Sequence, residues 1–382
     1  MRAPSRAAAA LAATCLTALT GLAACAAPDD VVSDVGPAAT ALTLTGDLRT
    51  HDPALVVDDR GTTATDDDVW YVFSTGDGRV ALGAPQIRRS VDSGATWEYV
   101  GELWTPADEP YWSREVVVGV DNFWAPEVVE HDGTYYAYYS ASTFGSNTSL
   151  VGLYTNTTLD PDDPAYRWVD EGEVWRSDGS TPYNAIDPGV VTDADGTPWM
   201  SFGSFWDGLF AVELEWPSGK PVGATPEQPQ GTAEPVHLAD RGTATNAIEA
   251  PYLLARDGWY YLFFSRDSCC QGVASTYNMA VGRSADPTGP YLDAAGVPLL
   301  DDGGTALLAT EGTMIGPGGQ SVAQVGETAY LAFHYYDEDL GGDFRLGIRE
   351  LAWTDDGWPV AQTAAELEAA QTLADESAEH SG

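Results

Sequence analysis

The sequence predicts an all-β protein that folds as a five-bladed β-propeller. One pattern recurs five times, beginning near residues 52, 126, 187, 250 and 320, at a spacing of roughly 60–75 residues. Each copy begins with a short apolar run and continues, after a turn, as an aromatic-rich run. Further strand-like segments bring each copy to about four strands, which is the content of one propeller blade. Helical periodicity is absent from the repeats, which argues against a (β/α) barrel.

The repeat is clearest from Asn184, where Asn-Ala-Ile-Asp-Pro-Gly-Val-Val precedes an Asp-Gly turn and the run Trp-Met-Ser-Phe. Asp-Gly between apolar runs is the strongest short signal for a β-hairpin. The same dipeptide joins the two runs in two of the other copies. Those other copies begin, in order along the chain, at His51, Phe123, Asn246 and Gly319.

The rest of each copy supplies the outer strands of its blade. A third strand-like segment follows every hairpin, and the five segments cover residues 87–90, 151–154, 209–212, 279–282 and 346–349. A fourth segment often carries tryptophan, and the tryptophans concerned are Trp97, Trp168 and Trp353. About four expected strands in each of five copies therefore fit a five-bladed propeller.

Residues 1–24 are expected to be a secretory signal peptide, because two arginines precede an apolar run rich in Ala and Thr. The run ends in Leu-Ala-Ala-Cys, which resembles a bacterial lipoprotein signal in which Cys25 carries lipid. Two acyl chains on Cys25 are enough for stable anchoring. A transmembrane anchor, and ordinary secretion with Cys25 incidental, are the competing interpretations. Residues 25–45 lack hydrophobic periodicity and are interpreted as a lipid-anchored, disordered tether.

Residues 46–362 form the predicted propeller domain, and residues 363–382 are expected to be a short helix at best, followed by an acidic tail. The chain has 17 Lys and Arg against 58 Asp and Glu, a formal net charge of −41. Such a surface repels nucleic acid and anionic lipid, and it offers no positive patch to an acidic polysaccharide. A neutral substrate is the natural partner, membrane contact is expected only through lipidated Cys25, and we expect a monomer.

Four cysteines are present, of which Cys15 leaves with the signal peptide and Cys25 is expected to be lipidated. Cys269 and Cys270 are adjacent, so they form either a vicinal disulfide or two thiols. Their spacing excludes a structural zinc site, which needs separated pairs. They lie just beyond the strand that follows Glu249, where a rigid apolar platform near a substrate is a plausible use.

Ser90-Val-Asp-Ser-Gly-Ala-Thr-Trp97 matches the Asp-box turn of sialidases and other propellers. It occurs once clearly, between expected outer strands, so a structural turn capped by Asp92 is the simpler interpretation. A sialidase also needs a cluster of arginines for its carboxylate sugar. The chain has few arginines and none at the starts of the inner strands, so this class is set aside.

Three acidic residues, Asp52, Asp187 and Glu249, stand at the starts of expected inner strands. Inner strands line the axis of a propeller, so the fold would bring these side chains to one mouth of the channel. Each could alternatively be an ordinary turn residue before proline. Two carboxylates across a scissile bond, with a third that tunes them, are typical of a glycosidase. Aromatic residues beside the acids, which could stack on sugar rings, are Phe123, Trp124, Tyr183, Phe205 and Trp206.

Six motifs give these acids a specific context. In order, they are His51-Asp-Pro, Trp124-Ala-Pro-Glu, Asn184-Ala-Ile-Asp-Pro, Ile248-Glu-Ala-Pro, Ser268-Cys-Cys-Gln-Gly and Phe333-His-Tyr-Tyr-Asp. Their order and spacing resemble family 43 glycoside hydrolases, specifically the endo-1,5-α-L-arabinanases, over nearly the whole propeller. The resemblance implies a five-bladed propeller, an inverting mechanism and arabinan, a neutral plant cell-wall polysaccharide, as the substrate.

The resemblance also implies roles for individual residues. Asp52 would be the general base that activates water, and Glu249 the general acid. Asp187 would orient Glu249 and raise its pKa. His334 would help to hold a metal, usually calcium, at the centre of the channel with waters. Calcium prefers oxygen ligands, so a channel histidine hydrogen-bonded to strand carbonyls is the alternative.

The expected substrate contacts are Phe123, Trp124, Asn184, Ser204 and Trp206. Some relatives carry a histidine after a Gly-Pro-Gly turn, whereas here Gly316-Pro-Gly-Gly-Gln320 has none. The other functions considered are an exo-acting α-L-arabinofuranosidase or β-xylosidase of the same family, and a carbohydrate-binding propeller without turnover. The expected location is extracellular, as a membrane-anchored bacterial lipoprotein.

Overall fold

The computed structural model describes residues 36–379 of the chain. The expected signal peptide, Cys25 and most of the expected tether therefore lie outside the described residues. Within the described part, no helix is both long and apolar enough to cross a membrane.

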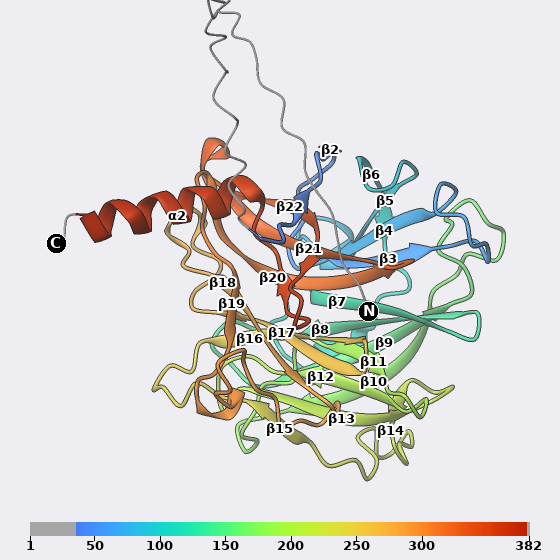
Figure 1. Cartoon of the computed structure of the whole chain (residues 1–382). Helices are drawn as coiled ribbons and strands as arrows, with labels where there is room; N and C mark the ends of the chain where they lie inside the picture. The colour runs from blue at the N-terminus through green and yellow to red at the C-terminus, as the bar shows by residue number, and fades with distance from the viewer. Residues whose placement is uncertain (1–35, 380–382) are drawn as a thin grey trace, which may run out of the picture. The chain divides into compact units, whose positions relative to one another are not determined.

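Five antiparallel sheets form the body of the chain from Val35 onward, as the five-bladed prediction requires (Figure 1). Apart from two short N-terminal strands described below, each blade sheet is built from a consecutive stretch of chain, so every blade is one copy of the repeat. The strands of the first two blades are β3 (Ala54–Asp58), β4 (Val69–Ser74), β5 (Gln86–Ser90) and β6 (Thr96–Glu102), then β7 (Trp124–His131), β8 (Thr134–Ala141), β9 (Ser149–Asn156) and β10 (Val169–Ser177).

The remaining blades follow the same plan. Blade 3 contains β11 (Gly189–Thr192), β12 (Pro198–Phe202), β13 (Leu209–Glu215), β14 (Lys220–Pro221) and β15 (Val236–Ala239). Blade 4 contains β16 (Ile248–Arg256), β17 (Trp259–Arg266), β18 (Asn278–Ser284) and β19 (Thr305–Leu308). Blade 5 contains β20 (Met314–Val325), β21 (Thr328–Asp337) and β22 (Asp343–Glu350). Short 3-10 turns lie in the connections: η1 (Ala81–Gly83), η2 (Gly272–Ala274), η3 (Leu299–Asp301) and η4 (Glu338–Leu340).

The first strands of the blades form a closed ring. Strand β3 contacts β7, β7 contacts β11, β11 contacts β16, β16 contacts β20, and β20 contacts β3. Five apolar clusters fill the spaces between neighbouring blades. Successive side chains of a strand point to opposite faces, so Tyr138 packs toward blade 3 while Tyr139 packs toward blade 1. Burial on both faces explains why the inner hairpins are almost continuously apolar.

The N-terminal segment completes two blades. Strand β1 (Thr40–Ala41) pairs with β22 and becomes the outer strand of blade 5. Strand β2 (Thr45–Gly46) pairs in parallel with β6 of blade 1. The boundary expected between residues 45 and 46 is therefore displaced, since the propeller already includes residues from Thr40. Trp353, expected on a fourth strand of blade 5, lies instead on β23 (Ala352–Trp353), which pairs with β24 (Pro359–Val360).

Two α-helices accompany the blades. Helix α1 (Tyr111–Val116) lies in the connection from blade 1 to blade 2, and α2 (Ala364–Glu379) extends from the end of blade 5 (Figure 1). Helix α2 is longer than the short helix expected within 363–382. Thr363 and Glu366 exchange hydrogen bonds at its start as a capping box, and Glu366 also accepts two bonds from Arg349 of β22.

The Asp-box sequence is a structural turn, as expected. The Asp92 carboxylate accepts hydrogen bonds from the Ser90 hydroxyl and the Thr96 amide, and the Trp97 indole donates to the carbonyl of Gly94. The turn lies between β5 and β6, in the outer part of blade 1, away from the inner strands.

Candidate active site

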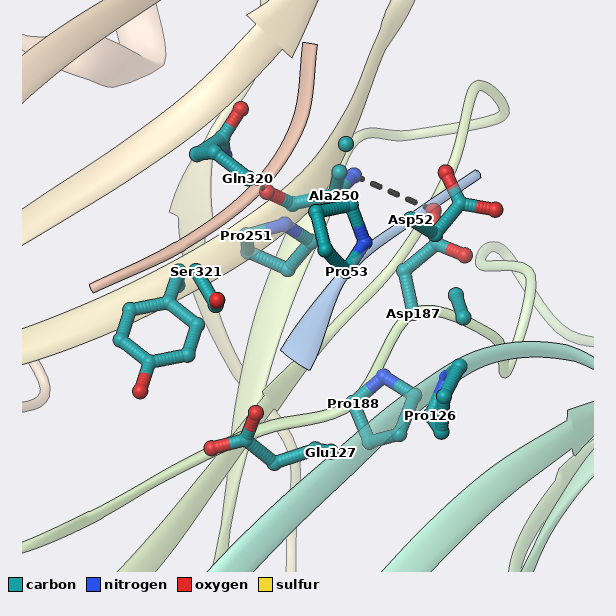
Figure 2. Close-up of a pocket in the computed structure, with 13 residues that line it drawn as sticks. Asp52, Pro53, Pro126, Glu127, Asp187, Pro188, Ala250, Pro251, Gln320 and Ser321 are labelled. Carbon is teal, nitrogen blue, oxygen red and sulfur yellow. Dashed lines mark hydrogen bonds between the residues drawn. The ribbon is translucent and has the colours of Figure 1, made fainter. Parts of the chain in front are cut away.

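Five equivalent residues mark the starts of the inner strands: Asp52, Ala125, Asp187, Ala250 and Gly319. All five have left-handed backbone dihedrals, with φ between 39° and 58°. All five line one small cavity of about 30 Å³ in the channel (Figure 2). Non-glycine residues rarely adopt this conformation, so its occurrence in every blade marks a shared and specific local structure.

Side chains at or just beyond the end of the preceding blade's second strand hold this structure in place. The amide of Ala125 donates to the Thr75 hydroxyl, that of Asp187 to Ser140, and that of Gly319 to Ser265. The Asp52 amide donates to Nδ1 of His334 in the same way, at 3.1 Å. His334 therefore has a structural role as the acceptor for the Asp52 amide, and this role does not depend on a metal.

Blade 3 differs from this pattern, and the difference positions one of the three acids. Gly203, which follows β12 and has no side chain, stands where the other blades carry the acceptor. The carboxylate of Asp187 accepts the Ala250 amide instead, at 3.1 Å. Asp187 is thereby tied to the residue that follows Glu249.

The prediction that Glu249 occupies the same repeat position as Asp52 and Asp187 is wrong. Glu249 lies one residue before the left-handed position, where the other blades have His51, Trp124, Ile186 and Gly318. Successive residues of an extended segment point in different directions. The acid and its equivalents in blades 1 to 3 consequently line the cleft above the channel rather than the small cavity in it.

That cleft is large, about 990 Å³, and it brings all three predicted acids together. Its walls come from the segments before the inner strands and from the turns that follow the second strands. Asp52 and Asp187 reach both the cleft and the channel cavity, whereas Glu249 faces the cleft alone.

Asp52 is held as an ionised carboxylate. Its Oδ2 lies 2.7 Å from Nδ1 of His51 and accepts a hydrogen bond of 2.6 Å from Thr75. Burial alone would raise the pKa of Asp52, but His51, His334 and Thr75 together outweigh burial and lower the pKa to about 2. An ionised carboxylate is the form that can take a proton from water.

Gly319 makes room for this carboxylate. A Cβ atom at Gly319 would lie 2.4 Å from Oδ1 of Asp52 and 2.8 Å from the ring of His334, closer than real Cβ contacts. The position also has φ of +58°, which glycine adopts at little cost. Glycine is therefore required here by both the backbone and the neighbouring acid.

Glu249 and Asp187 behave as a coupled pair. Burial raises the pKa of Glu249, while hydrogen bonds from Ser204 and Tyr277 act against that rise. Burial, and then the negative charge of Glu249, raise the pKa of Asp187 well above its usual range. Two buried carboxyls that oppose each other's ionisation lose their protons at higher pH than isolated carboxyl groups would. The site thus contains one carboxyl group with a lowered pKa and two with raised pKa values, the contrast that acid–base hydrolysis of a glycoside needs.

The five predicted substrate contacts separate into three groups. Trp124, Asn184 and Trp206 line the cleft, and Trp206 is 36% exposed. Ser204 also lines the cleft, but its hydroxyl donates to Oε2 of Glu249 at 2.8 Å and so positions the acid. The prediction for Phe123 is wrong, because its ring is fully buried between Trp104 and Tyr139 in the core between blades 1 and 2.

Several site residues escaped the sequence analysis. Thr75 and Tyr277 contact Asp52 and Glu249, and Phe144 lies at the cleft, 81% exposed, with its ring 5.0 Å from that of Trp124. A Ser or Thr that recurs near the end of the second strand in blades 1, 2 and 4 was the available signal for Thr75. Phe144 and Tyr277 lie in turns whose path the repeat does not define.

His334, the expected metal ligand, lies beside two other residues that could bind a cation. Ligand atoms of His51, Asp52 and His334 lie within 4.8 Å of one another, and Nε2 of His334 is buried without a hydrogen-bond partner. Nδ1 of His334 accepts the Asp52 amide, so the neutral ring carries its proton on Nε2, and a protonated Nε2 cannot bind a cation directly. The Nε2–H group can instead donate to a water molecule of a hydrated cation. The residues fit a largely hydrated cation and do not form an oxygen cage.

Comparisons with known proteins agree with this site. Residues 48–359 match the family described as Glycosyl hydrolases family 43. An extracellular endo-alpha-(1→5)-L-arabinanase of Bacillus subtilis is 36% identical over 329 residues, covering 86% of this chain and 93% of the relative. An extracellular exo-alpha-(1→5)-L-arabinofuranosidase of Cellvibrio japonicus is 37% identical, covering 81% and 85%.

A solved structure gives the same result for the fold. The Cellvibrio cellulosa alpha-L-arabinanase complexed with arabinohexaose has a TM-score of 0.72 and 35% identity, covering 84% of this chain and 96% of that one. With the acids at the mouth of a five-bladed ring and a match over most of its length, this chain belongs to glycosyl hydrolase family 43.

Proposed function

We propose that this glycoside hydrolase cleaves internal α-1,5-L-arabinofuranosyl linkages of arabinan with inversion of configuration. The observation that carries the proposal is the set of three acids in one cleft, one with a lowered pKa and two with raised pKa values. Relatives named as arabinanases over most of their length supply the substrate class. The acidic surface and the exposed aromatic rings suit a neutral polysaccharide.

In the proposed reaction, Asp52 removes a proton from a water molecule as that water attacks the anomeric carbon. Its low pKa keeps it ionised at neutral pH, and its bonds to His51 and Thr75 fix the orientation of Oδ2. Oδ1 accepts no hydrogen bond of normal length from the described residues, so it is the oxygen free to bind water.

On the other side of the bond, Glu249 donates a proton to the leaving oxygen. Ser204 and Tyr277 hold its carboxyl group, and Asp187 beside it discourages its ionisation. Asp187 therefore acts through its electrostatic coupling to Glu249 rather than by proton transfer to the substrate. Because water attacks directly, no covalent intermediate forms on the protein.

We infer that a hydrated calcium ion binds near His334, with water molecules as its ligands and Nε2 of this residue in contact with one of them. When bound, the cation would supply positive charge at the floor of the cleft. The protein residues nevertheless complete the acid–base roles described above, and no step of the reaction depends on the ion.

We also infer that the mature protein is an extracellular monomer, anchored through a lipid on Cys25. The Bacillus and Cellvibrio relatives are named as extracellular proteins, and Leu-Ala-Ala-Cys ends an apolar N-terminal run. Replacing Cys25 with serine should move the enzyme from the membrane fraction to the soluble fraction at unchanged specific activity. Unchanged fractionation would contradict the lipid anchor. Light scattering of the soluble form should give the mass of one chain.

Product analysis on linear arabinan tests the proposed function most simply. An endo-acting enzyme produces a ladder of oligosaccharides from the first minutes and lowers the viscosity early. A single short product from the start would identify the exo-acting alternative, which one of the relatives represents. Hydrolysis of xylan rather than arabinan would identify a β-xylosidase, and binding without turnover would identify a carbohydrate-binding propeller.

A further inference from the structure

The loop from Ser268 to Thr276 places a disulfide at the rim of the catalytic cleft. Cys269 and Cys270, which are neighbours in the chain, are joined to each other. Cys270 is exposed and lines the cleft, and its backbone is left-handed with φ of 66°. This conformation is unfavourable for a residue with a side chain, so something in the structure must hold it.

The base of the loop is closed without the disulfide. Ser268 and Thr276 exchange two hydrogen bonds, and the amide of Gln271 donates to the Ser275 hydroxyl. Gly342, in the turn between β21 and β22, packs closely against this loop, since a Cβ atom there would lie 2.7 Å from the amide nitrogen of Val273. The loop should therefore remain in place when the disulfide is broken. What the disulfide fixes is the local geometry of Cys270.

The amide of Cys270 begins a chain of hydrogen bonds that reaches the catalytic base. It donates to the hydroxyl oxygen of Tyr336 at 2.7 Å. That oxygen lies 3.0 Å from Nε2 of His51, and Nδ1 of His51 lies 2.7 Å from Oδ2 of Asp52. Sγ of Cys270 is also 4.0 Å from Nε2 of His51 and so packs on the same ring.

The first bond sets the direction of the others. Because Tyr336 accepts a hydrogen from Cys270, its own hydroxyl hydrogen is free to point at Nε2 of His51. Nε2 then acts as an acceptor, so the neutral imidazole carries its proton on Nδ1, which faces Asp52. This tautomer donates to the carboxylate and holds it in one orientation. The reverse tautomer would set two lone pairs against each other.

We propose that the Cys269–Cys270 disulfide is a positioning element for the catalytic base, acting through Tyr336 and His51, and that its reduction lowers turnover. The inference rests on the proposed role of Asp52. Neither cysteine touches the reacting atoms. The disulfide holds Cys270 in the conformation that aims its amide at Tyr336. When that hydrogen bond is lost, Tyr336 is no longer committed to donate to Nε2 of His51, and the hydrogen bond from Nδ1 of His51 to Asp52 is no longer fixed.

Reduction with a water-soluble phosphine is the direct perturbation. Phosphorus attacks one sulfur and the S–S bond breaks. Water then provides the oxygen of the phosphine oxide and the two protons of the thiols. Misplacement of a reacting group by about 1 Å costs roughly 100-fold, so kcat on arabinan should fall by roughly 10- to 100-fold. KM should stay within about twofold, because substrate contacts elsewhere in the cleft are unchanged, and reoxidation should restore kcat.

Two variants separate positioning from a general loss of structure. The double variant with Cys269→Ser and Cys270→Ser should match the reduced wild-type enzyme and should not respond to phosphine. Tyr336→Phe keeps the ring and removes the hydroxyl group. It should lose kcat to a similar extent, and reduction should then cost it little more, because both changes break the same chain. An equal further loss in Tyr336→Phe, or an effect on KM alone, would overturn the proposal.

Amide hydrogen exchange at Cys270 gives a readout that does not depend on the substrate. Exchange should accelerate on reduction, because the bond to Tyr336 is lost, while the strands of blade 4 keep their protection. Unchanged exchange at Cys270 would overturn the proposal even if arabinan proves to be a poor substrate. An oxidised enzyme that leaves arabinan intact, but shows the accelerated exchange on reduction, would instead contradict the proposed function.

Discussion

Glu127 should make the stability of the protein depend on pH in a way that one substitution removes. This residue lies on β7, is 2% exposed, and lines the channel cavity below the catalytic acids (Figure 2). Among the described residues, its Oε1 has no hydrogen-bond partner. Burial raises the pKa of Glu127 to about 8, although interactions with Val190 and Tyr252 act in the opposite direction.

The sign and size of the effect follow from linkage. Below pH 4.5, the ordinary value for a glutamate, the carboxyl group is protonated in both the folded and the unfolded chain. Between pH 4.5 and 8 the unfolded chain loses this proton and the folded chain keeps it, so the free energy of unfolding falls. Above pH 8 the loss is complete. The difference between 4.5 and about 8 corresponds to about 5 kcal/mol at 1.36 kcal/mol per pKa unit.

Urea denaturation of the wild type and of Glu127→Gln at pH 5, 7 and 9 measures this contribution. An amide cannot ionise, so the free energy of unfolding of the variant should improve relative to the wild type by about 4 kcal/mol between pH 5 and pH 9, since part of the total effect is already present at pH 5. Glu130→Gln is the matched control, since it removes an exposed carboxylate from the same strand. A difference between Glu127→Gln and the wild type that is constant across this pH range would refute the reasoning.

Three further predictions concern the catalytic cleft. Asp187→Asn should move the upper limb of the kcat/KM–pH profile to lower pH, because Glu249 would no longer be coupled to a second carboxyl group. An unmoved limb would exclude the proposed effect of Asp187 on the pKa of Glu249. Gly319→Ala should lower kcat by roughly 100-fold, since its Cβ would displace Asp52, and steady-state kinetics showing wild-type kcat would contradict that crowding. Dialysis against a chelator should lower the melting temperature of the wild type but not of His334→Gln, with recovery on adding calcium; the same midpoint before and after dialysis would exclude the cation site.

The fold was largely accessible from the sequence because the repeat is local. Hairpin turns and alternating apolar runs define four strands in each blade, and the structure confirms five blades. The pairing of the N-terminal strand with the last blade could not be predicted from the sequence in the same way. Strand β1 has only two residues, and its pairing with β22 joins segments about 300 residues apart, which no local pattern records. The same limit explains why Trp353 was assigned to the wrong strand.

The three acids were accessible because the repeat places them at strand starts, and the structure brings them into one cleft. The one-residue offset of Glu249 was missed although the sequence contains its signal: Asp52 and Asp187 directly precede a proline, whereas Ala250 separates Glu249 from the next proline. Phe123 was assigned to the substrate because it adjoins Trp124. Neighbouring residues of an extended strand face opposite sides, so only one of the two could reach the cleft.

The division of labour between Glu249 and Asp52 is the central claim, and one comparison tests it directly. An arabino-oligosaccharide with a good leaving group, such as dinitrophenol, needs little protonation of the departing oxygen. We expect this substrate to restore much of the lost kcat in Glu249→Ala. It should restore hardly any in Asp52→Ala, where the residue that activates water is still missing. Equal restoration in both variants, or restoration in Asp52→Ala alone, would contradict the central claim.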